Sequence, residues 1–303
     1  MHILAEAIRD GIVVLDGGLA TRLEERGHDL SSALWSARLL REDPEEIVAA
    51  HRDYFAAGAR VAITASYQAS FDGFAAAGVD RAETARLLTR SVRLADRARQ
   101  ESTRRCWVAA SVGPYGAALA DGSEYRGDYD LSVAQLRAWH RPRLQVLAEA
   151  GADVLALETI PCLAEAEALL AEVSGLGLPV WLSMTAERGR TRAGEPIAEA
   201  FAMAADVDEV IAAGVNCCAA TQVAELTTIA ATASGKPVVA YPNSGESWDA
   251  DNRCWAGDPT FTPESVTDWV GAGARLIGGC CRVGPDQIRA LSAAVNGPHV
   301  AGS

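Results

Sequence analysis

The chain has 303 residues, of which 49% are hydrophobic and 22% charged, an ordinary composition for a globular protein with a sizeable core. Its formal charge of -13 argues against nucleic acid as a partner, because duplex binding needs basic side chains that displace counterions from phosphates. No apolar run approaches the roughly 20 residues that span a bilayer. The N-terminus has neither a basic start nor a small-residue cleavage site. We therefore expect a cytoplasmic protein without a membrane partner.

Short β-branched or apolar runs alternate along the chain with longer Ala- and Leu-rich stretches of helical periodicity. The expected strands are 12–15, 61–64, 107–111, 154–158, 180–184, 214–216, 238–241 and 275–279. Among the helices between them, 43–58 is expected to begin at an Asp cap and end at Gly58, and 163–177 to end in glycines.

Strands that alternate with helices imply a parallel sheet. Eight such units in a chain of this length favour a single (β/α)8 TIM barrel, with residues 1–303 as one domain. The unusual residues follow the strands, whereas the segments that enter the strands are plain. Barrel enzymes build their sites from the loops at the C-terminal ends of the strands, so these loops should converge on one pocket.

Cysteine pairs end two of these units, Cys217 and Cys218 after the sixth strand and Cys280 and Cys281 after the eighth. Converging thiolates form a soft site for which zinc is the expected metal, and the five histidines all lie outside the strand-end loops. Core packing and vicinal disulfides are the alternatives, and spacing does not decide between Cys217 and Cys218. We expect the isolated Cys106 and Cys162 to be buried packing residues.

Three protein ligands would leave one position of a tetrahedral zinc open, which is typical of a catalytic site. A substrate thiol in that position would lose its proton and remain nucleophilic at neutral pH. Three anionic sulfurs make the metal a poor Lewis acid, so hydrolysis by activated water is the weaker interpretation. A lysine Schiff-base enzyme has a single candidate, Lys236, in a turn.

Seven segments together resemble the zinc-dependent homocysteine S-methyltransferase family. They are "DGGLATRLEERG", "TASYQAS", "VGPYGAALADGSEYRGDY", "LETIP", "GVNCC", "YPNSGE" and "GGCC", and the resemblance runs from about residue 12 to about residue 290. It implies a (β/α)8 barrel whose catalytic zinc is held by Cys217, Cys280 and Cys281. Cys218 falls outside that ligand pattern.

The resemblance also implies that the amino acid end of homocysteine lies at Asp16, Gly17, Gly18 and Glu158. The chemistry agrees, because an ammonium needs a carboxylate partner and glycine N–H groups at a helix start can hold a carboxylate. Asp16 as a helix cap and Glu158 as a solvated strand end are the alternatives.

The methyl donor is inferred from one segment of the sequence and from the length of the chain. There is no G-x-G-x-x-G loop, and the 114–129 segment and compact length resemble the branch that uses S-methylmethionine, with S-adenosylmethionine as a second donor. A sulfonium cation suits carboxylates and aromatic faces, for which Glu124, Tyr115, Tyr125 and Trp248 are candidates. These tyrosines could equally be loop anchors.

The expected reaction is methyl transfer from the sulfonium to homocysteine, giving methionine. The rivals are selenocysteine or another thiol as acceptor, betaine as donor, and a zinc-storage or thiol redox-sensing barrel without turnover. The sequence does not give the oligomeric state, nor whether Asn216, Thr64 or Asn243 touches substrate.

Overall fold

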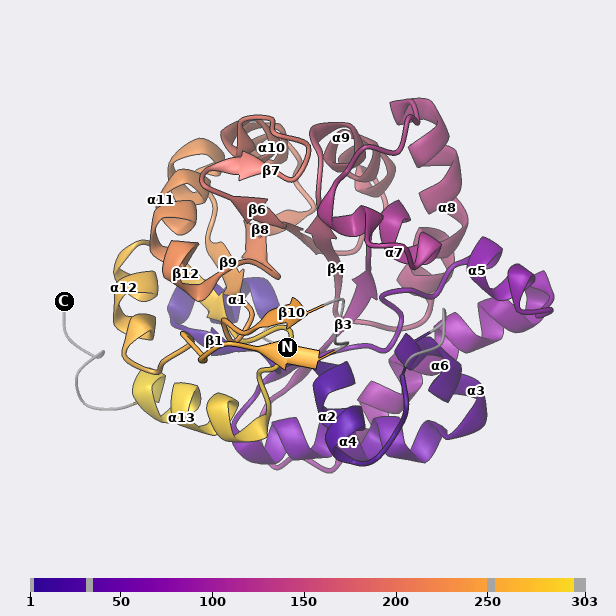
Figure 1. Cartoon of the computed structure of the whole chain (residues 1–303), viewed down its shortest axis with the longest axis horizontal. Helices are drawn as coiled ribbons and strands as arrows, with labels where there is room; N and C mark the ends of the chain where they lie inside the picture. Colours follow the sequence, from indigo (N-terminus) through magenta and orange to yellow (C-terminus); the bar gives the residue numbers. More distant parts are fainter. Residues whose placement is uncertain (1–2, 31–34, 250–253, 297–303) are drawn as a thin grey trace.

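Eight parallel strands form the centre of the computed structural model, which describes residues 3–30, 35–249 and 254–296. They are β1 (Val13–Val14), β2 (Val61–Ile63), β3 (Trp107–Val112), β4 (Val154–Ile160), β5 (Val180–Met184), β8 (Val210–Asn216), β9 (Val238–Tyr241) and β12 (Ala274–Ile277). The sheet order is β1-β12-β9-β8-β5-β4-β3-β2, and a bridge between Leu15 and Val61 closes it into a barrel. The predicted (β/α)8 barrel and its eight strands are confirmed (Figure 1).

Helices surround the strands (Figure 1). Those of the first half are α1 (Leu4–Asp10), α2 (Leu19–Glu25), α3 (Leu39–Glu42), α4 (Pro44–Ala57), α5 (Phe71–Ala76), α6 (Arg81–Gln100) and α7 (Tyr115–Leu119), with 3-10 turns η1 (Trp35–Arg38) and η2 (Ser123–Tyr125). Those of the second half are α8 (Val133–Glu149), α9 (Leu163–Val173), α10 (Ile197–Ala205), α11 (Val223–Ser234), α12 (Ser265–Gly271) and α13 (Pro285–Asn296), with η3 (Ala220–Gln222). Within the described residues, no helix is both long and apolar enough to cross a membrane.

The two predicted helices are present with one difference each. Asp43 stands at the N-cap of α4, but its side chain makes no capping hydrogen bond. Pro44 begins the helix instead, because its fixed φ suits the first turn and its missing N–H needs no partner. Gly58 ends α4 in the left-handed region as predicted, with φ 117°. The other helix, α9, ends at Val173, ahead of the glycines.

The barrel has an inner and an outer core. Inward-facing side chains such as Leu15, Trp181 and Leu276 fill its interior, as in other barrels of this type. Leu4 and Ile8 of α1 belong to the same cluster and seal the end where the strands begin. A larger outer cluster lies between the strands and the surrounding helices. The end of the barrel where the strands begin is therefore closed by apolar side chains. The polar residues of a site have to lie at the other end, where the strands finish.

Two hairpins that the sequence analysis did not predict extend this functional end. β6 (Ala186–Glu187) pairs with β7 (Arg190–Thr191) after β5, and β10 (Ser247–Asp249) pairs with β11 (Cys254–Ala256) after β9. Strands of two or three residues are too short to show a hydrophobic alternation, so their pattern is that of a loop.

Candidate metal centre and amino acid site

Three thiols meet at the mouth of the barrel, where β8 and β12 end. The Sγ atoms of Cys217, Cys280 and Cys281 all lie within 4.8 Å of one another. Cys217 adopts a left-handed conformation, with φ 52°, directly after the last residue of β8. The adjacent Cys218 is buried in the outer core, so only one cysteine of this pair joins the group. The structure thus brings together the three residues that the family resemblance implies.

The spacing and chemistry of these thiols fit zinc. Bonds of about 2.3 Å in a tetrahedral site separate two sulfur ligands by about 3.8 Å, and the Sγ atoms of Cys217 and Cys281 are 3.7 Å apart. Hydrogen bonds from Cys280 and Cys281 lower the pKa of the Cys217 thiol well below its usual value. The same interaction with Cys217 raises the pKa of Cys280 and Cys281. One thiol of the cluster loses its proton readily, and a bound divalent cation would allow the other two to lose theirs.

The loop that carries Cys280 and Cys281 is held by its own backbone. The Cys280 N–H donates to the Pro242 carbonyl at 2.7 Å, and the Cys281 N–H donates to Asn243 Oδ1 at 3.1 Å. A Cβ on Gly278 would lie 2.6 Å from the Leu15 Cβ, which is too close for any other residue. The glycines before the cysteine pair therefore permit close packing against the β1 loop.

Two buried carboxylates lie at the ends of β1 and β4. Asp16 Oδ2 accepts a hydrogen bond from the Ile63 N–H at 2.8 Å, whereas Oδ1 is buried without a partner among the described residues. Glu158 accepts hydrogen bonds from the hydroxyls of Ser111 and Tyr241, the latter at 3.1 Å. Burial raises the pKa of Asp16 well above its usual value and that of Glu158 to about 7.

Neither carboxylate has an ion-pair partner within the described part of the chain, and the charge of Glu158 adds to the rise in the pKa of Asp16. Burial disfavours the ionised form of both groups, and a cationic ligand would stabilise that form. Glu158 is therefore not a solvated strand end, and the Asp16 side chain bonds to β2 rather than to a helix start.

Gly17 and Gly18 connect Asp16 to α2, with Gly18 at the N-cap. A Cβ on Gly17 would lie 2.2 Å from the Val283 carbonyl oxygen, and one on Gly18 would lie 2.6 Å from the Cys280 oxygen. The Gly18 N–H already donates to the Val283 oxygen at 3.0 Å. This N–H is therefore engaged within the protein, and close packing is the observed reason for the glycine at this position.

The segment after β3 approaches the thiols from the opposite side. Tyr125 Oη lies 3.3 Å from Cys217 Sγ, and the guanidinium of Arg192 lies over the Tyr125 ring, 5.7 Å from its centroid. Glu124 Oε2 is buried and has no hydrogen-bond partner among the described residues. Burial raises the pKa of Glu124. Both residues thus lie where a cation near the thiols would be favoured.

The other two donor candidates are placed differently. Tyr115 packs edge-on against Tyr129 and Trp139, at centroid distances of 5.3 and 5.1 Å, which is the arrangement of a loop anchor. The backbone of Trp248 belongs to β10, and its side chain lies outside the described part of the structure.

A buried charged cluster anchors the start of this segment. Arg143 donates to the Gly113 carbonyl and lies 3.0 Å from His140 Nδ1, while His140 Nε2 lies 2.8 Å from Glu165 Oε1. The same Glu165 oxygen accepts the Tyr115 N–H at 2.5 Å. Burial lowers the pKa of His140 to about 4, so this histidine is neutral and links the two charged groups. The cluster fixes the backbone on both sides of Pro114.

Several residues left open by the sequence have their polar side-chain atoms hydrogen-bonded within the protein. Asn216 Oδ1 accepts from the Thr159 N–H and the Ser183 hydroxyl, and its Nδ2 donates to Thr159 Oγ1. Thr64 bonds to Ser66 and the Ser111 N–H. Lys236 donates to the carbonyls of Val207 and Val210, at the start of β8 and far from the end where the strands finish.

Sequence reasoning missed three supporting residues. Ser111 and Tyr241 each lie at the end of a predicted strand, so their position was a usable signal for a place beside Glu158. Asn243 lies in a loop, and its Oδ1 accepts the Cys281 N–H. The sequence analysis named this residue without a role.

A parallel barrel with a thiol cluster and buried acids at its mouth defines a class of barrel enzymes with a metal site. The comparisons identify the family within that class. The profile described as "Homocysteine S-methyltransferase" matches residues 13–295, and the chain belongs to this family.

Among its relatives, the homocysteine S-methyltransferase YbgG of Bacillus subtilis is 44% identical over 295 residues, covering 93% of this chain and 94% of that protein. A selenocysteine Se-methyltransferase of Brassica oleracea is 41% identical, covering 93% and 88% of the two chains. The crystal structure of the homocysteine methyltransferase MmuM from Escherichia coli in its metallated form superposes with a TM-score of 0.85, at 42% identity and 95% and 98% coverage. The resemblance seen in the sequence is thereby confirmed.

Proposed function

We propose that the protein transfers a methyl group from a sulfonium donor to homocysteine, giving methionine, and that residues 1–303 act as one homocysteine-binding domain. The observation that supports this most directly is the combination of three thiols with two buried carboxylates, Asp16 and Glu158, that lack a cation among the described residues. A thiol-bearing amino acid has both the soft sulfur and the ammonium that this combination suits.

In this proposal Cys217, Cys280 and Cys281 hold a zinc ion and leave one position for the substrate sulfur. Zinc, when bound, keeps a substrate thiol deprotonated at neutral pH. Asp16 and Glu158 bind the ammonium, and Ser111 and Tyr241 keep the Glu158 carboxylate in place.

The homocysteine thiolate then attacks the donor's methyl carbon in line with the bond to the sulfonium. The new C–S bond uses a thiolate electron pair, and the broken bond leaves its pair on the donor sulfur as a neutral thioether. No side chain has to accept a proton in this step, so the rate gain comes mainly from positioning the two reactants. Charge is neutralised as the anion and the cation react.

S-methylmethionine, with S-adenosylmethionine as a second donor, is the proposed donor class. Tyr125 supports it, because its hydroxyl lies 3.3 Å from Cys217 Sγ, where a sulfonium would have to approach. Glu124 supports it too, because its buried Oε2 has no hydrogen-bond partner among the described residues and the carboxylate interacts electrostatically with Cys217.

The test is methionine formation by the reduced, zinc-loaded protein, with S-methylmethionine, S-adenosylmethionine and betaine offered separately. We expect turnover with S-methylmethionine that is lost on chelation. Turnover with betaine alone would contradict the donor assignment, and the absence of methionine from every donor would favour a storage or redox-sensing barrel.

Selenocysteine is a second candidate acceptor, because a relative named selenocysteine Se-methyltransferase is 41% identical to this chain. Rates with homocysteine, selenocysteine and cysteine, measured with one donor, distinguish the two acceptors.

A further inference from the structure

The loop after β1 and the loop after β12 pack directly against each other. The first carries Asp16 to Gly18 and the second runs from Cys280 to Val283. The Gly279 N–H donates to the Asp16 carbonyl at 3.1 Å, and the Gly18 N–H donates to the Val283 carbonyl at 3.0 Å. We call this contact the seam between the amino acid loop and the metal loop.

Glycine is needed in the seam because no side chain fits between the two backbones. A Cβ on Gly17 would lie 2.2 Å from the Val283 oxygen and 2.9 Å from Tyr54 Cε1. Close-packed backbones transmit displacements because they have little free space to absorb them. A restraint on one loop is therefore a restraint on the other.

Tyr54 of α4 joins both loops through a single hydroxyl. Tyr54 Oη lies 2.8 Å from the Gly18 oxygen and 3.1 Å from the Val283 oxygen, and the residue has no exposed surface. The Val283 N–H in turn donates to the Cys280 carbonyl at 3.2 Å. One hydroxyl proton is shared between the carbonyls of the two loops, and the second of these is one hydrogen bond from a predicted zinc ligand.

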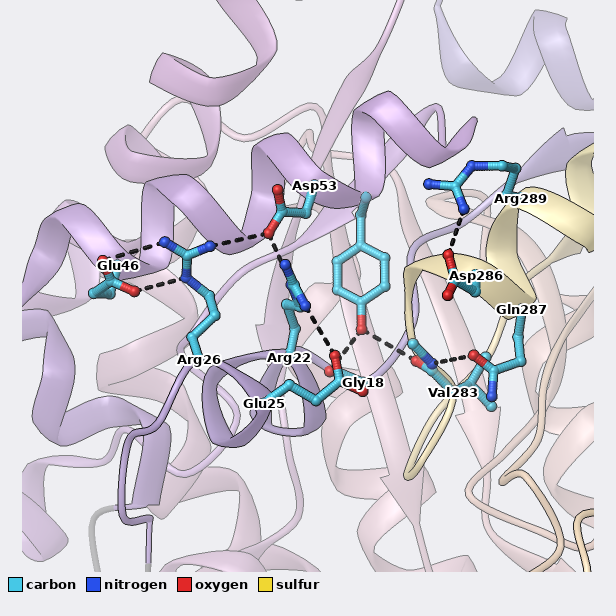
Figure 2. A network of polar contacts seen from close by, with 12 residues as sticks. Gly18, Arg22, Glu25, Arg26, Glu46, Asp53, Val283, Asp286, Gln287 and Arg289 are labelled. Atoms are coloured by element: carbon cyan, nitrogen blue, oxygen red, sulfur yellow. Dashed lines mark hydrogen bonds and ion pairs between the residues drawn. The ribbon is translucent and has the colours of Figure 1, made fainter.

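The helix that carries Tyr54 is itself fixed against α2. Arg22 Nε lies 2.7 Å from Asp53 Oδ2, and Arg26 bonds to both Asp53 and Glu46 (Figure 2). Figure 2 shows Gly18 and Val283 next to this ionic network. The Tyr54 hydroxyl is therefore presented to the seam from a fixed helix.

We propose that Tyr54 is a positioning residue that couples the two loops, so that an amino acid bound at Asp16 tightens metal binding at Cys280 and Cys281. This inference rests on the proposed function, which places an amino acid at Asp16. The bound amino acid orders the first loop, and the seam orders the second before the metal arrives. The metal then binds at a lower cost in ordering, and the coupling is reciprocal.

The experiment uses L-2-aminobutanoate, which has the amino acid end of homocysteine but no sulfur to bind the metal. Zinc affinity is measured by competition with a chromophoric chelator, with and without this compound. In the unaltered protein we expect the compound to tighten zinc binding about 10-fold, within the usual range of coupling between sites. In Tyr54→Phe, which keeps the ring but lacks the hydroxyl, we expect a change of less than about 2-fold.

Ser91→Ala is the matched control. It removes another buried hydroxyl that donates to a carbonyl, that of Leu88 at 2.7 Å, within α6 and away from the seam. Thr21→Val tests the same seam independently, because Thr21 Oγ1 accepts the Arg282 N–H at 2.9 Å. We expect Ser91→Ala to keep the coupling and Thr21→Val to weaken it.

Full coupling in a folded Tyr54→Phe protein would overturn the proposal, as would no coupling in the unaltered protein or an equal loss in Ser91→Ala. If Tyr54→Phe does not fold, retained coupling in Thr21→Val would overturn it. The methionine assay reports separately on the proposed function, because it requires turnover and the zinc competition does not.

Discussion

The two sides of the barrel mouth are built in different ways. On the thiol side, the loops after β1 and β12 hold each other through backbone hydrogen bonds and glycine contacts, and the loop after β9 bonds to the loops after β8 and β12. On the opposite side, the longer segment 113–129 after β3 is fixed at its start by the buried side chains of Arg143, His140 and Glu165. Both sides meet where Tyr125 lies 3.3 Å from Cys217.

This difference indicates how tolerant each side is to change. Backbone contacts leave no space for a new side chain, so the thiol side should accept few substitutions even where no catalytic atom is altered. A segment held at its start by a side-chain cluster can vary further along without losing its anchor. We therefore expect the thiol side to fix the acceptor and the 113–129 segment to set the donor.

The largest expected effect comes from removing a thiol. Cys280→Ala should release the metal and lower activity by at least about 1000-fold, as for other groups that act only as part of a set. Metal analysis of the purified protein and a methionine assay check this. Cys218→Ala is the matched control, since Cys218 packs in the outer core, and full activity in Cys280→Ala would refute the metal site.

The second-largest effect is expected from the charged cluster that anchors the segment 113–129. Glu165→Gln keeps the size of the side chain but leaves the fully buried Arg143 without its counter-charge, at a cost of roughly 3 kcal/mol in the free energy of unfolding. The KM for the donor should rise while the KM for homocysteine stays close to that of the unaltered protein. Denaturant unfolding and steady-state kinetics measure both.

Glu45→Gln serves as the control for that variant, because Glu45 and Arg97 form an exposed ion pair, and such pairs contribute little to the free energy of unfolding. Equal increases in both KM values for Glu165→Gln would argue that the cluster serves the whole mouth rather than the donor segment.

A smaller effect is expected from Asp16→Asn, which keeps the hydrogen bond from Ile63 but removes the negative charge. The KM for homocysteine should rise about 10- to 100-fold, the usual loss for one charge-assisted contact. The KM for the donor should change little. A homocysteine KM that does not move would exclude Asp16 from binding the ammonium.

The smallest effect at neutral pH concerns the two buried histidines. Burial lowers the pKa of His51 and of His140 to about 4, below the ordinary value of 6.5. Both are neutral in the folded and the unfolded state well above pH 6.5, so they do not affect stability there. Between pH 6.5 and 4 the unfolded chain takes up protons that the folded chain does not, and stability falls by up to about 3 kcal/mol for each.

His51→Leu should therefore flatten the acid side of the unfolding curve and leave turnover at pH 7.5 unchanged. His51 has no hydrogen-bond partner for either ring nitrogen in the described structure, so its replacement by leucine removes no hydrogen bond. An unchanged acid slope would show that His51 is protonated in the folded protein.

Much of this arrangement was predictable because the barrel imposes it. The eight strands have clear apolar runs. Their order places Cys217 and Cys280 at one mouth of the barrel, although the two residues are 63 positions apart along the chain. The seam was less accessible, because the glycine contacts depend on distances between loops. The cluster of Arg143, His140 and Glu165 lies on two helices whose polar residues look solvent-exposed in sequence. The packing of α8 against α9, together with the contacts to Gly113 and Tyr115, buries them.

The spacing of the thiols also has a consequence for how the chain opens. Cys217 and Cys281 are 64 residues apart in sequence. They follow β8 and β12, two strands that are not neighbours because β9 lies between them. A metal bound to both would act as a cross-link that closes this long loop. Amide hydrogen exchange from β9 through β12 should then slow on metal loading, because local unfolding of this part of the barrel would require the cross-link to open.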